Sequence, residues 1–336
     1  MRRILVIAAL AASTIVAGML PVPVSGAGPL SQSPAAAKPV EVRGGSRLTL
    51  PTLASDGLPS DISLSALSVY QGGALKLRVT NARSGSATVL GRTTPLVPDG
   101  GDVIGYAGIG TEDPPYAAAV TLDFVAADGQ RQRQERWFTI LKTQWTVDYI
   151  IVPPPNPNAP PPPPGLVDEQ PRLDALYRGV SPRKWLNNWQ SPLTPPPAGL
   201  IDCARAALGA FPCVSGYFGE QRSFDGGPVQ GHHGGTDLAA KEGTPIYAAN
   251  DGVVVLAERV LQRGNLVVID HGGNVFSAYG HMTAFVVVNG DSVARGQLIG
   301  YVGSTGLSTG PHLHWEIAIG GFVVDGLRWL DGSQGF

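Results

Sequence analysis

Short runs that alternate apolar and polar residues recur in the first half of the chain. Residues 74–79 and 120–125 place an apolar side chain at every second position, as half-buried strands do, and 137–140 is a third candidate. Turn-forming clusters such as 98–101 separate these runs. Several short strands at this spacing predict an all-β N-terminal domain over residues 46–152, a β-sandwich of roughly 100 residues.

From about residue 200 the pattern changes to short apolar runs that are separated by glycine. Almost no helical periodicity interrupts these runs. The pattern therefore predicts a second all-β domain over residues 200–336. Its expected strands are 253–256, 266–269, 275–279, 297–302 and 313–317.

The region between the two domains, residues 153–199, is expected to be a proline-rich linker with one short helix. The proline tract 153–165 favours extended polyproline II, which makes a stiff spacer or a surface loop. A short helix is predicted over 168–178. Trp185 and Trp189 follow at helical spacing, and we expect them to pack this region onto a domain.

The N-terminus has the pattern of an export signal. Arg2 and Arg3 precede an uncharged apolar run over 4–20, and small residues then offer a cleavage zone. We predict a signal peptide over 1–27, followed by a flexible Pro/Ala/Gly/Ser-rich leader over 28–45. The alternative is an uncleaved membrane anchor, because the apolar run is barely long enough to cross a bilayer. Either way, the expected location is secreted or cell envelope, extracytoplasmic.

Composition and cysteine usage narrow the picture further. Hydrophobic residues make up 43% of the chain, which is enough for a packed core, and the net charge of -2 offers no basic surface for nucleic acid. Cys203 and Cys213 are the two cysteines, and in an exported chain we predict a disulfide between them. A metal-binding pair is the alternative, but their spacing is wider than that of a zinc knuckle.

All six histidines lie in one stretch of the C-terminal domain. Histidines that serve only in packing have no reason to gather in this way, so the clustering points to a single site. They are His232, His233, His271, His281, His312 and His314.

Three local patterns contain most of these histidines. His232 and His233 stand just before Asp237, and an imidazole and a carboxylate four residues apart can both reach one zinc ion. His281 ends a predicted strand. His312 and His314 alternate within another strand, so they should point to the same side, with their Cα atoms about 7 Å apart.

This mixture of residues suits a catalytic zinc centre. A catalytic zinc ion keeps three protein ligands and leaves a fourth position for water, whose pKa it lowers toward about 7. Two histidines and one aspartate would form the ligand set. Two further neutral imidazoles would remain to accept a proton or to bind the developing oxyanion.

Over residues 214–330 the sequence resembles the lysostaphin-type, or LytM-like, zinc metalloendopeptidases. One motif is His233-Gly234-Gly235-Thr236-Asp237, and a second is Tyr279-Gly280-His281-Met282, where Met282 replaces the usual leucine. Colinear segments between and after them complete the match, namely Gly243-Thr244-Pro245-Ile246-Tyr247-Ala248-Ala249, Asp251-Gly252-Val253-Val254, Gly264-Asn265-Leu266-Val267-Val268-Ile269-Asp270-His271-Gly272, Gly303-Ser304-Thr305-Gly306 and Ser308-Thr309-Gly310-Pro311-His312-Leu313-His314-Trp315-Glu316.

The resemblance implies a role for each histidine. It implies His233, Asp237 and His314 as ligands of one Zn²⁺ per chain, and His281 and His312 as the catalytic pair. His232 is then a neighbour of the site that could support a ligand. We interpret His271 as a turn residue between two strands.

The resemblance also implies the fold and the substrate. Members of the family have a compact two-sheet β domain with a groove over the zinc ion, and they cut cross-link, bridge or stem peptides of peptidoglycan. Residues 216–219 and Arg222 resemble the family's entry to the first strand, a candidate groove wall. The N-terminal region looks like the immunoglobulin-like domain of some secreted members. The expected partner is therefore peptidoglycan peptide, with no nucleic acid, and with a membrane only if the signal is uncleaved.

Two alternatives remain open at the level of sequence. A relative of the same fold can be a catalytically inactive envelope protein that binds the wall or activates another hydrolase, although such relatives lose ligands or catalytic histidines and this chain keeps all five positions. An active enzyme can also be latent, with the N-terminal domain, the proline tract or the Cys203–Cys213 loop covering the groove.

Overall fold

The computed structural model describes residues 59–151, 169–185, 188–193 and 213–330, and all of them fall in one compact unit. The predicted signal peptide, the leader, the proline tract and Cys203 lie outside the described residues. Cys213 is buried at the start of a strand, and its disulfide with Cys203 stays a prediction. No helix among the described residues has the length and apolar character needed to cross a membrane.

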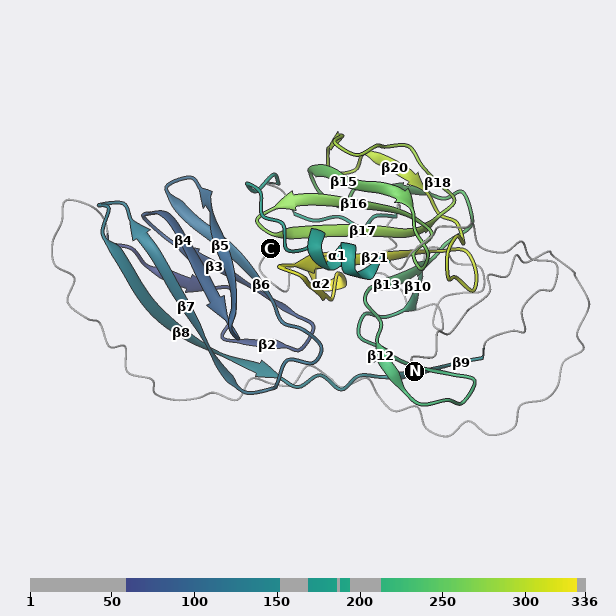
Figure 1. The fold of residues 1–336 in the computed structure, drawn as a ribbon, viewed down its shortest axis with the longest axis horizontal. Helices are drawn as coiled ribbons and strands as arrows, with labels where there is room; N and C mark the ends of the chain where they lie inside the picture. Colours follow the sequence, from purple (N-terminus) through teal and green to yellow (C-terminus); the bar gives the residue numbers. More distant parts are fainter. Residues whose placement is uncertain (1–58, 152–168, 186–187, 194–212, 331–336) are drawn as a thin grey trace, which may run out of the picture. The chain divides into compact units, whose positions relative to one another are not determined.

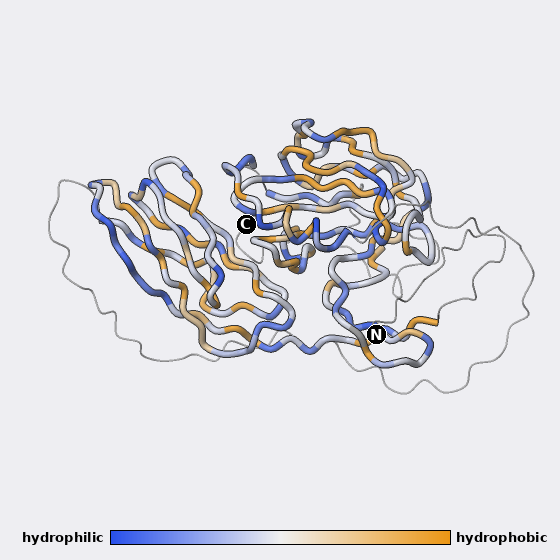
Figure 2. Tube along the Cα trace, viewed as in Figure 1, coloured by the Kyte–Doolittle hydropathy of each residue, from blue (hydrophilic) through white to orange (hydrophobic). Residues whose placement is uncertain are grey.

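Eight strands of the N-terminal region form one continuous sheet in the order β1-β3-β6-β5-β4-β7-β8-β2 (Figure 1). Three of them contain the predicted strands 74–79, 120–125 and 137–140, which are confirmed. The start of β8, residues 131–136, is hydrophilic and blue in Figure 2. The bounds are β1 Ile62–Leu64, β2 Ser68–Tyr70, β3 Ala74–Val79, β4 Ala82–Val89, β5 Arg92–Asp99, β6 Asp102–Gly108, β7 Ala117–Ala126 and β8 Arg131–Leu141.

Strand β5 joins the two halves of the predicted β-sandwich into one half-barrel sheet. Its residues 92–96 pair with β4, whereas residues 97–99 pair with β6. Leu96 and Val97 are consecutive buried residues in an otherwise alternating strand, so the buried face changes at that point. Side chains from both arms of the sheet then enclose one apolar core. The immunoglobulin-like assignment stays a prediction.

The C-terminal region is built around a sheet with the order β10-β13-β21-β17-β16-β15-β19, to which β22 is added beside β21. A second sheet has the order β14-β20-β18, and a third has the order β12-β11-β9. The five predicted strands are confirmed in β15, β16, β17, β20 and β21. The bounds are β9 Val147–Ile150, β10 Cys213–Gly216, β11 Gln221–Phe224, β12 Gln230–His232, β13 Thr236–Ala239, β14 Pro245–Tyr247, β15 Gly252–Arg259, β16 Asn265–Gly272, β17 Val275–Met282, β18 Ala284–Phe285, β19 Ser292–Val293, β20 Leu298–Tyr301, β21 His312–Ile319 and β22 Phe322–Val324.

The two faces of the main sheet bury different partners. On one face, Trp315 and Ile317 of β21 pack in the same core as Ile246 of β14 and Ile299 of β20. On the other face, the sheet is covered by helix α1 (Gln170–Leu176), whose Leu173 shares a core with β15, β16, β17 and β21 (Figure 1). The predicted short helix is therefore confirmed. A second short helix, α2, spans Leu327–Leu330.

Two predictions on single residues have different outcomes. Trp185 and Trp189 are each only 4% exposed and join the core of the C-terminal region, as expected. The assignment of His271 to a turn is wrong. His271 lies within β16, fully buried, with its ring nitrogens 2.7 Å from Asp251 O and 2.7 Å from Ser277 Oγ. Gly273 and Asn274, both at positive φ, make the turn that follows β16. Burial lowers the pKa of His271 to about 4, so it is a neutral core residue.

We predict that Leu173→Ala lowers the free energy of unfolding by about 2–5 kcal/mol, because it leaves a cavity beneath α1 where Leu173 is fully buried. Urea titration followed by tryptophan fluorescence measures the change, since the buried tryptophans report on the C-terminal core. Val288→Ala, at a side chain that is 63% exposed, is the control and should change stability by less than about 0.5 kcal/mol. Equal effects of the two variants would contradict the packing of α1.

Candidate metal centre

Strand pairing brings the predicted site residues together. Asp237 of β13 is directly opposite His314 of β21, and Gly280 of β17 is opposite His314 on the other side. His281 follows Gly280, and His312 lies two residues before His314 on the same face of β21. The short link between β12 and β13 supplies His233. All five predicted metal and catalytic residues therefore meet at one end of three adjacent strands.

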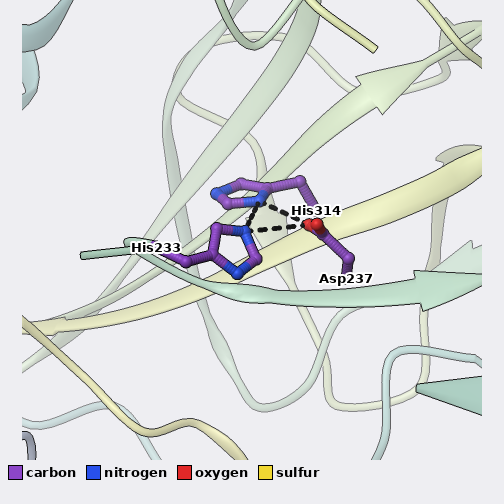
Figure 3. Close-up of side chains that lie close together, drawn as sticks. All are labelled: His233, Asp237 and His314. Atoms are coloured by element: carbon purple, nitrogen blue, oxygen red, sulfur yellow. Dashed lines mark hydrogen bonds and ion pairs between the residues drawn. The ribbon is translucent and has the colours of Figure 1, made fainter. Parts of the chain in front are cut away.

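The three predicted metal ligands point their donor atoms at one another (Figure 3). Asp237 Oδ1 lies 3.1 Å from His233 Nε2 and 2.8 Å from His314 Nδ1, and the two nitrogens are 3.2 Å apart. Ligand atoms at the usual zinc distances of about 2.0–2.1 Å in a tetrahedron stand about 3.3 Å from one another. The two imidazoles and one carboxylate thus fit a small divalent metal ion in both chemistry and spacing.

The outer nitrogen of each predicted ligand imidazole is held by a hydrogen bond. His233 Nδ1 donates to the carbonyl oxygen of Tyr217 at 2.9 Å, and His314 Nε2 donates to Glu316 Oε1 at 2.9 Å. Such a bond fixes the ring orientation and leaves the lone pair on the other nitrogen for the metal. The second carboxylate oxygen of Asp237 accepts from Arg222 Nη2 at 3.1 Å, which holds Oδ1 toward the centre.

The two predicted catalytic histidines stand beside the triad. Their ring centroids are 4.6 Å apart, and His281 lies 5.8 Å from the ring of His314. His281 Nδ1 donates to Thr305 O at 2.7 Å and His312 Nδ1 donates to Gly310 O at 2.8 Å. Each ring therefore keeps Nε2 available as an acceptor.

Burial keeps this pair of imidazoles neutral. Burial, together with the nearby rings of His312 and His314, lowers the pKa of His281 to about 3. Burial also lowers the pKa of His312, although the Asp237 carboxylate opposes the effect. At neutral pH both rings are free bases, which can accept a proton or donate one after being charged.

The backbone at His281 is held in an uncommon conformation. Its φ of 60° lies in the left-handed region, where residues other than glycine are rare and tend to mark functional positions. The His281 N–H donates to the carbonyl oxygen of Arg263 at 2.7 Å. A neighbouring loop thus supports the residue in the orientation that places its ring beside the triad.

The charges of the ligands are strongly coupled. Burial raises the pKa of Asp237, but its hydrogen bonds with His233 and His314 outweigh that effect and hold the pKa well below its usual range. Burial lowers the pKa of His314, yet its bonds to Asp237 and Glu316 raise it to about 9. In the metal-free protein, His314 is thus an imidazolium that donates to a carboxylate from each nitrogen.

His232, the predicted neighbour of the site, does not join the triad. Its Nδ1 lies 2.7 Å from Gly219 O and its Nε2 lies 2.7 Å from the carboxylate of Glu112. The indole of Trp145 packs at 5.0 Å from its ring. Both nitrogens of His232 are therefore engaged away from the ligands.

Sequence reasoning missed several residues that contact the site. Glu316 stands two residues after His314 in the same strand, so alternation alone could have placed it on the same face. Arg222 was expected only as a groove wall, and its ion pair with Asp237 was not foreseen. The support of His281 by Arg263 had no local signal, because the contact is tertiary.

We predict that zinc binding at pH 7 releases about one proton, because the metal needs the Nδ1 lone pair of His314 and the pKa of this ring, about 9, lies above pH 7. Proton release should fall toward zero as the pH rises through about 9, and the apparent affinity should rise with pH up to about 9 and then level off. Calorimetry in buffers of different ionisation enthalpy measures the proton count. Release that is absent at pH 7 would contradict the protonated state of His314.

Comparisons with known proteins agree with this geometry. Residues 231–326 match the model of Peptidase family M23. The peptidoglycan DD-endopeptidase ShyA of Vibrio cholerae is 45% identical over 96 residues, which is 29% of this chain and 22% of that protein. The DD-carboxypeptidase/endopeptidase Mpg of Neisseria meningitidis is 48% identical over 93 residues, 28% of this chain and 21% of that protein. The chain thus spans only about a fifth of the length of these relatives.

A crystal structure described as a peptidase M23 from Pseudomonas aeruginosa extends the likeness of the fold. The superposition covers 77% of this chain and 93% of the chain in that crystal structure, with a TM-score of 0.52. The sequence identity is 23%, so the likeness concerns the fold alone. The family model spans all five side chains that meet in the structure. The match to peptidase family M23 therefore covers residues 231–326, which contain the His-Asp-His triad.

Proposed function

We propose that this chain is an extracytoplasmic zinc endopeptidase that hydrolyses peptide bonds of peptidoglycan, in its cross-link or stem peptides. The observation that carries the proposal is the convergence of His233, Asp237 and His314 beside two neutral imidazoles, those of His281 and His312. The names of the relatives, a peptidoglycan DD-endopeptidase and a DD-carboxypeptidase/endopeptidase, support the substrate class.

Zinc is the metal that the donor set favours. Two imidazole nitrogens and one carboxylate oxygen, with room for a further ligand, are typical of catalytic zinc. When bound there, zinc lowers the pKa of a coordinated water toward about 7 and polarises the scissile carbonyl. Asp237 contributes the negative charge that offsets the cation, and Arg222 restrains its second oxygen.

His281 and His312 would move protons and stabilise charge. In the proposed mechanism, the neutral Nε2 of one ring accepts a proton from the attacking water and later donates it to the leaving amine. The other ring, with a second proton taken up from solvent at Nε2, would donate a hydrogen bond to the negative oxygen of the tetrahedral intermediate. Their Nδ1–H groups bind the carbonyl oxygens of Thr305 and Gly310, which keeps Nε2 directed at the substrate.

The rest of the chain fits an exported enzyme. We propose cleavage of a signal peptide near residue 27 and a disulfide between Cys203 and Cys213. We also propose an N-terminal immunoglobulin-like domain over 46–152, followed by the linker 153–199 and the peptidase domain 200–336. Peptidoglycan lies outside the cytoplasmic membrane, so an export signal and a wall substrate support each other.

Digestion of purified peptidoglycan tests the proposal. The zinc-loaded full chain should release fragments whose masses, measured by mass spectrometry, show hydrolysis of a peptide bond and identify the bond that is cut. Addition of a chelator should abolish the release, and added zinc should restore it. Full zinc loading without cleavage of any wall peptide would favour the inactive, wall-binding alternative.

We predict that His281→Ala keeps the zinc ion and loses about 10²–10⁴-fold in kcat, because it removes a proton-transfer group without removing a ligand. Zinc content by elemental analysis and turnover on muropeptides separate the two effects. Asp237→Ala is the comparison variant and should lose both the zinc ion and the activity, since Asp237 Oδ1 lies within reach of both ligand imidazoles. Normal turnover in His281→Ala would refute its role.

A further inference from the structure

A buried carboxylate stands behind the ligand His314. Glu316 is fully buried and accepts three hydrogen bonds from three parts of the chain. The donors are His314 Nε2 at 2.9 Å, Arg263 Nε at 2.6 Å and the hydroxyl of Tyr177 at 2.8 Å. A buried carboxylate is stable only when such donors satisfy it, so its orientation, and with it that of the His314 ring, depends on Arg263 and Tyr177.

Tyr177 comes from outside the family-matched residues. It caps the C-terminal end of α1 and is only 1% exposed. Its ring packs with Phe276 at a centroid distance of 5.8 Å, on the sheet face that Leu173 also covers. The packing anchors the ring independently of the hydroxyl, which is therefore free to serve the hydrogen bond to Glu316.

Glu169, just before α1, binds the loop that carries Arg263. Its buried carboxylate accepts from the backbone N–H groups of Gln262 at 3.1 Å and Arg263 at 2.9 Å. It also pairs with Arg263 Nη1 at 3.3 Å. Arg263 in turn binds Glu316 with its side chain and the His281 N–H with its carbonyl oxygen. Arg263 thus links Glu169 both to Glu316, which supports the predicted ligand His314, and to the predicted catalytic residue His281.

We propose that Tyr177 and Glu169 are positioning residues of the metal centre, with Tyr177 acting on His314 through Glu316 and Glu169 acting on Glu316 and His281 through Arg263. The segment 169–177 thereby completes a site whose ligands all lie within residues 231–326. The inference rests on the proposed function only for the identity of the metal, since the contacts themselves are independent of the substrate.

Two isosteric variants of the full chain test this assignment. Tyr177→Phe removes one hydroxyl and keeps the ring, and Glu169→Gln removes one charge and keeps the shape. Each should weaken zinc binding about tenfold, at the low end of the 10–100-fold loss that is typical when a group supporting a metal ligand is removed. Competition with a chromophoric chelator measures the zinc affinity, without any need for substrate.

A spectroscopic readout separates positioning from general stability. In the Co²⁺-substituted protein, the visible absorption bands should shift in both variants, because the orientation of the His314 ring alters the ligand field. Tyr279→Phe is the matched control. It loses a buried hydroxyl that bonds to Ala249 N and Ser277 Oγ in the opposite core, so its zinc affinity and Co²⁺ spectrum should match those of the wild type.

The outcomes distinguish this inference from the proposed function. A wild-type chain that binds zinc and cleaves peptidoglycan, with unchanged affinity and spectrum in Tyr177→Phe and Glu169→Gln, would overturn the inference and leave the function intact. A wild-type chain that does not bind zinc through His314 would overturn both. If one variant fails to fold, the other still decides, because the two residues reach Glu316 by separate contacts.

Discussion

The register between β13 and β21 is the constraint on which the site depends. Asp237 and His314 are direct cross-strand partners, and His312 is opposite Ala239 in the same ladder. Because side chains alternate across a sheet, a slip of one residue would turn Asp237 into the apolar core and Leu238 toward the predicted metal site. Leu238 and Leu313 are fully buried in that core, so their burial fixes the register that the ligands need.

The same pairing concentrates charge in a mostly buried part of the sheet. Asp237, His314, Glu316 and Arg263 form a continuous chain of ion pairs and hydrogen bonds, in which Glu316 and His314 are almost fully buried. Taking these groups out of water is costly, and their mutual attraction offsets the cost only when the geometry is good. A bound cation fits this arrangement, since it would replace the extra proton that His314 carries between two carboxylates.

The sequence predicted the side chains of the site itself better than it predicted the residues that hold them in place. The five side chains of the site were predictable because each lies in a short motif, and the alternation of His312 and His314 placed them on one face. Glu316 follows the same alternation and could have been added. Arg263 and Tyr177 could not, because their contacts with Glu316 join positions 53 and 139 residues apart in the chain.

The fold shows a similar division. Alternating runs located the strands of both regions. The half-barrel depended on two consecutive buried residues of β5, which a rule based on strict alternation does not predict. His271 was misplaced because the adjacent glycines suggested a turn over 270–273, whereas β16 continues to Gly272 and the turn begins at Gly273. In each case, the local pattern identified the element and the tertiary packing decided where its buried face or its end would lie.

The segment before the catalytic motifs changes how the domain boundary is understood. Helix α1 covers a sheet face that would otherwise expose the apolar side chains of Leu256, Leu266 and Val268, and it brings Tyr177 to Glu316. Strand β9, which follows the half-barrel, pairs in parallel with β11 of the C-terminal region. A boundary drawn from motifs alone would remove both elements, and with them an apolar cover and a hydrogen bond on which the orientation of a metal ligand depends. Strand β9 and helix α1 are thus better understood as parts of the C-terminal region, and α1 also brings Tyr177 to the predicted metal centre.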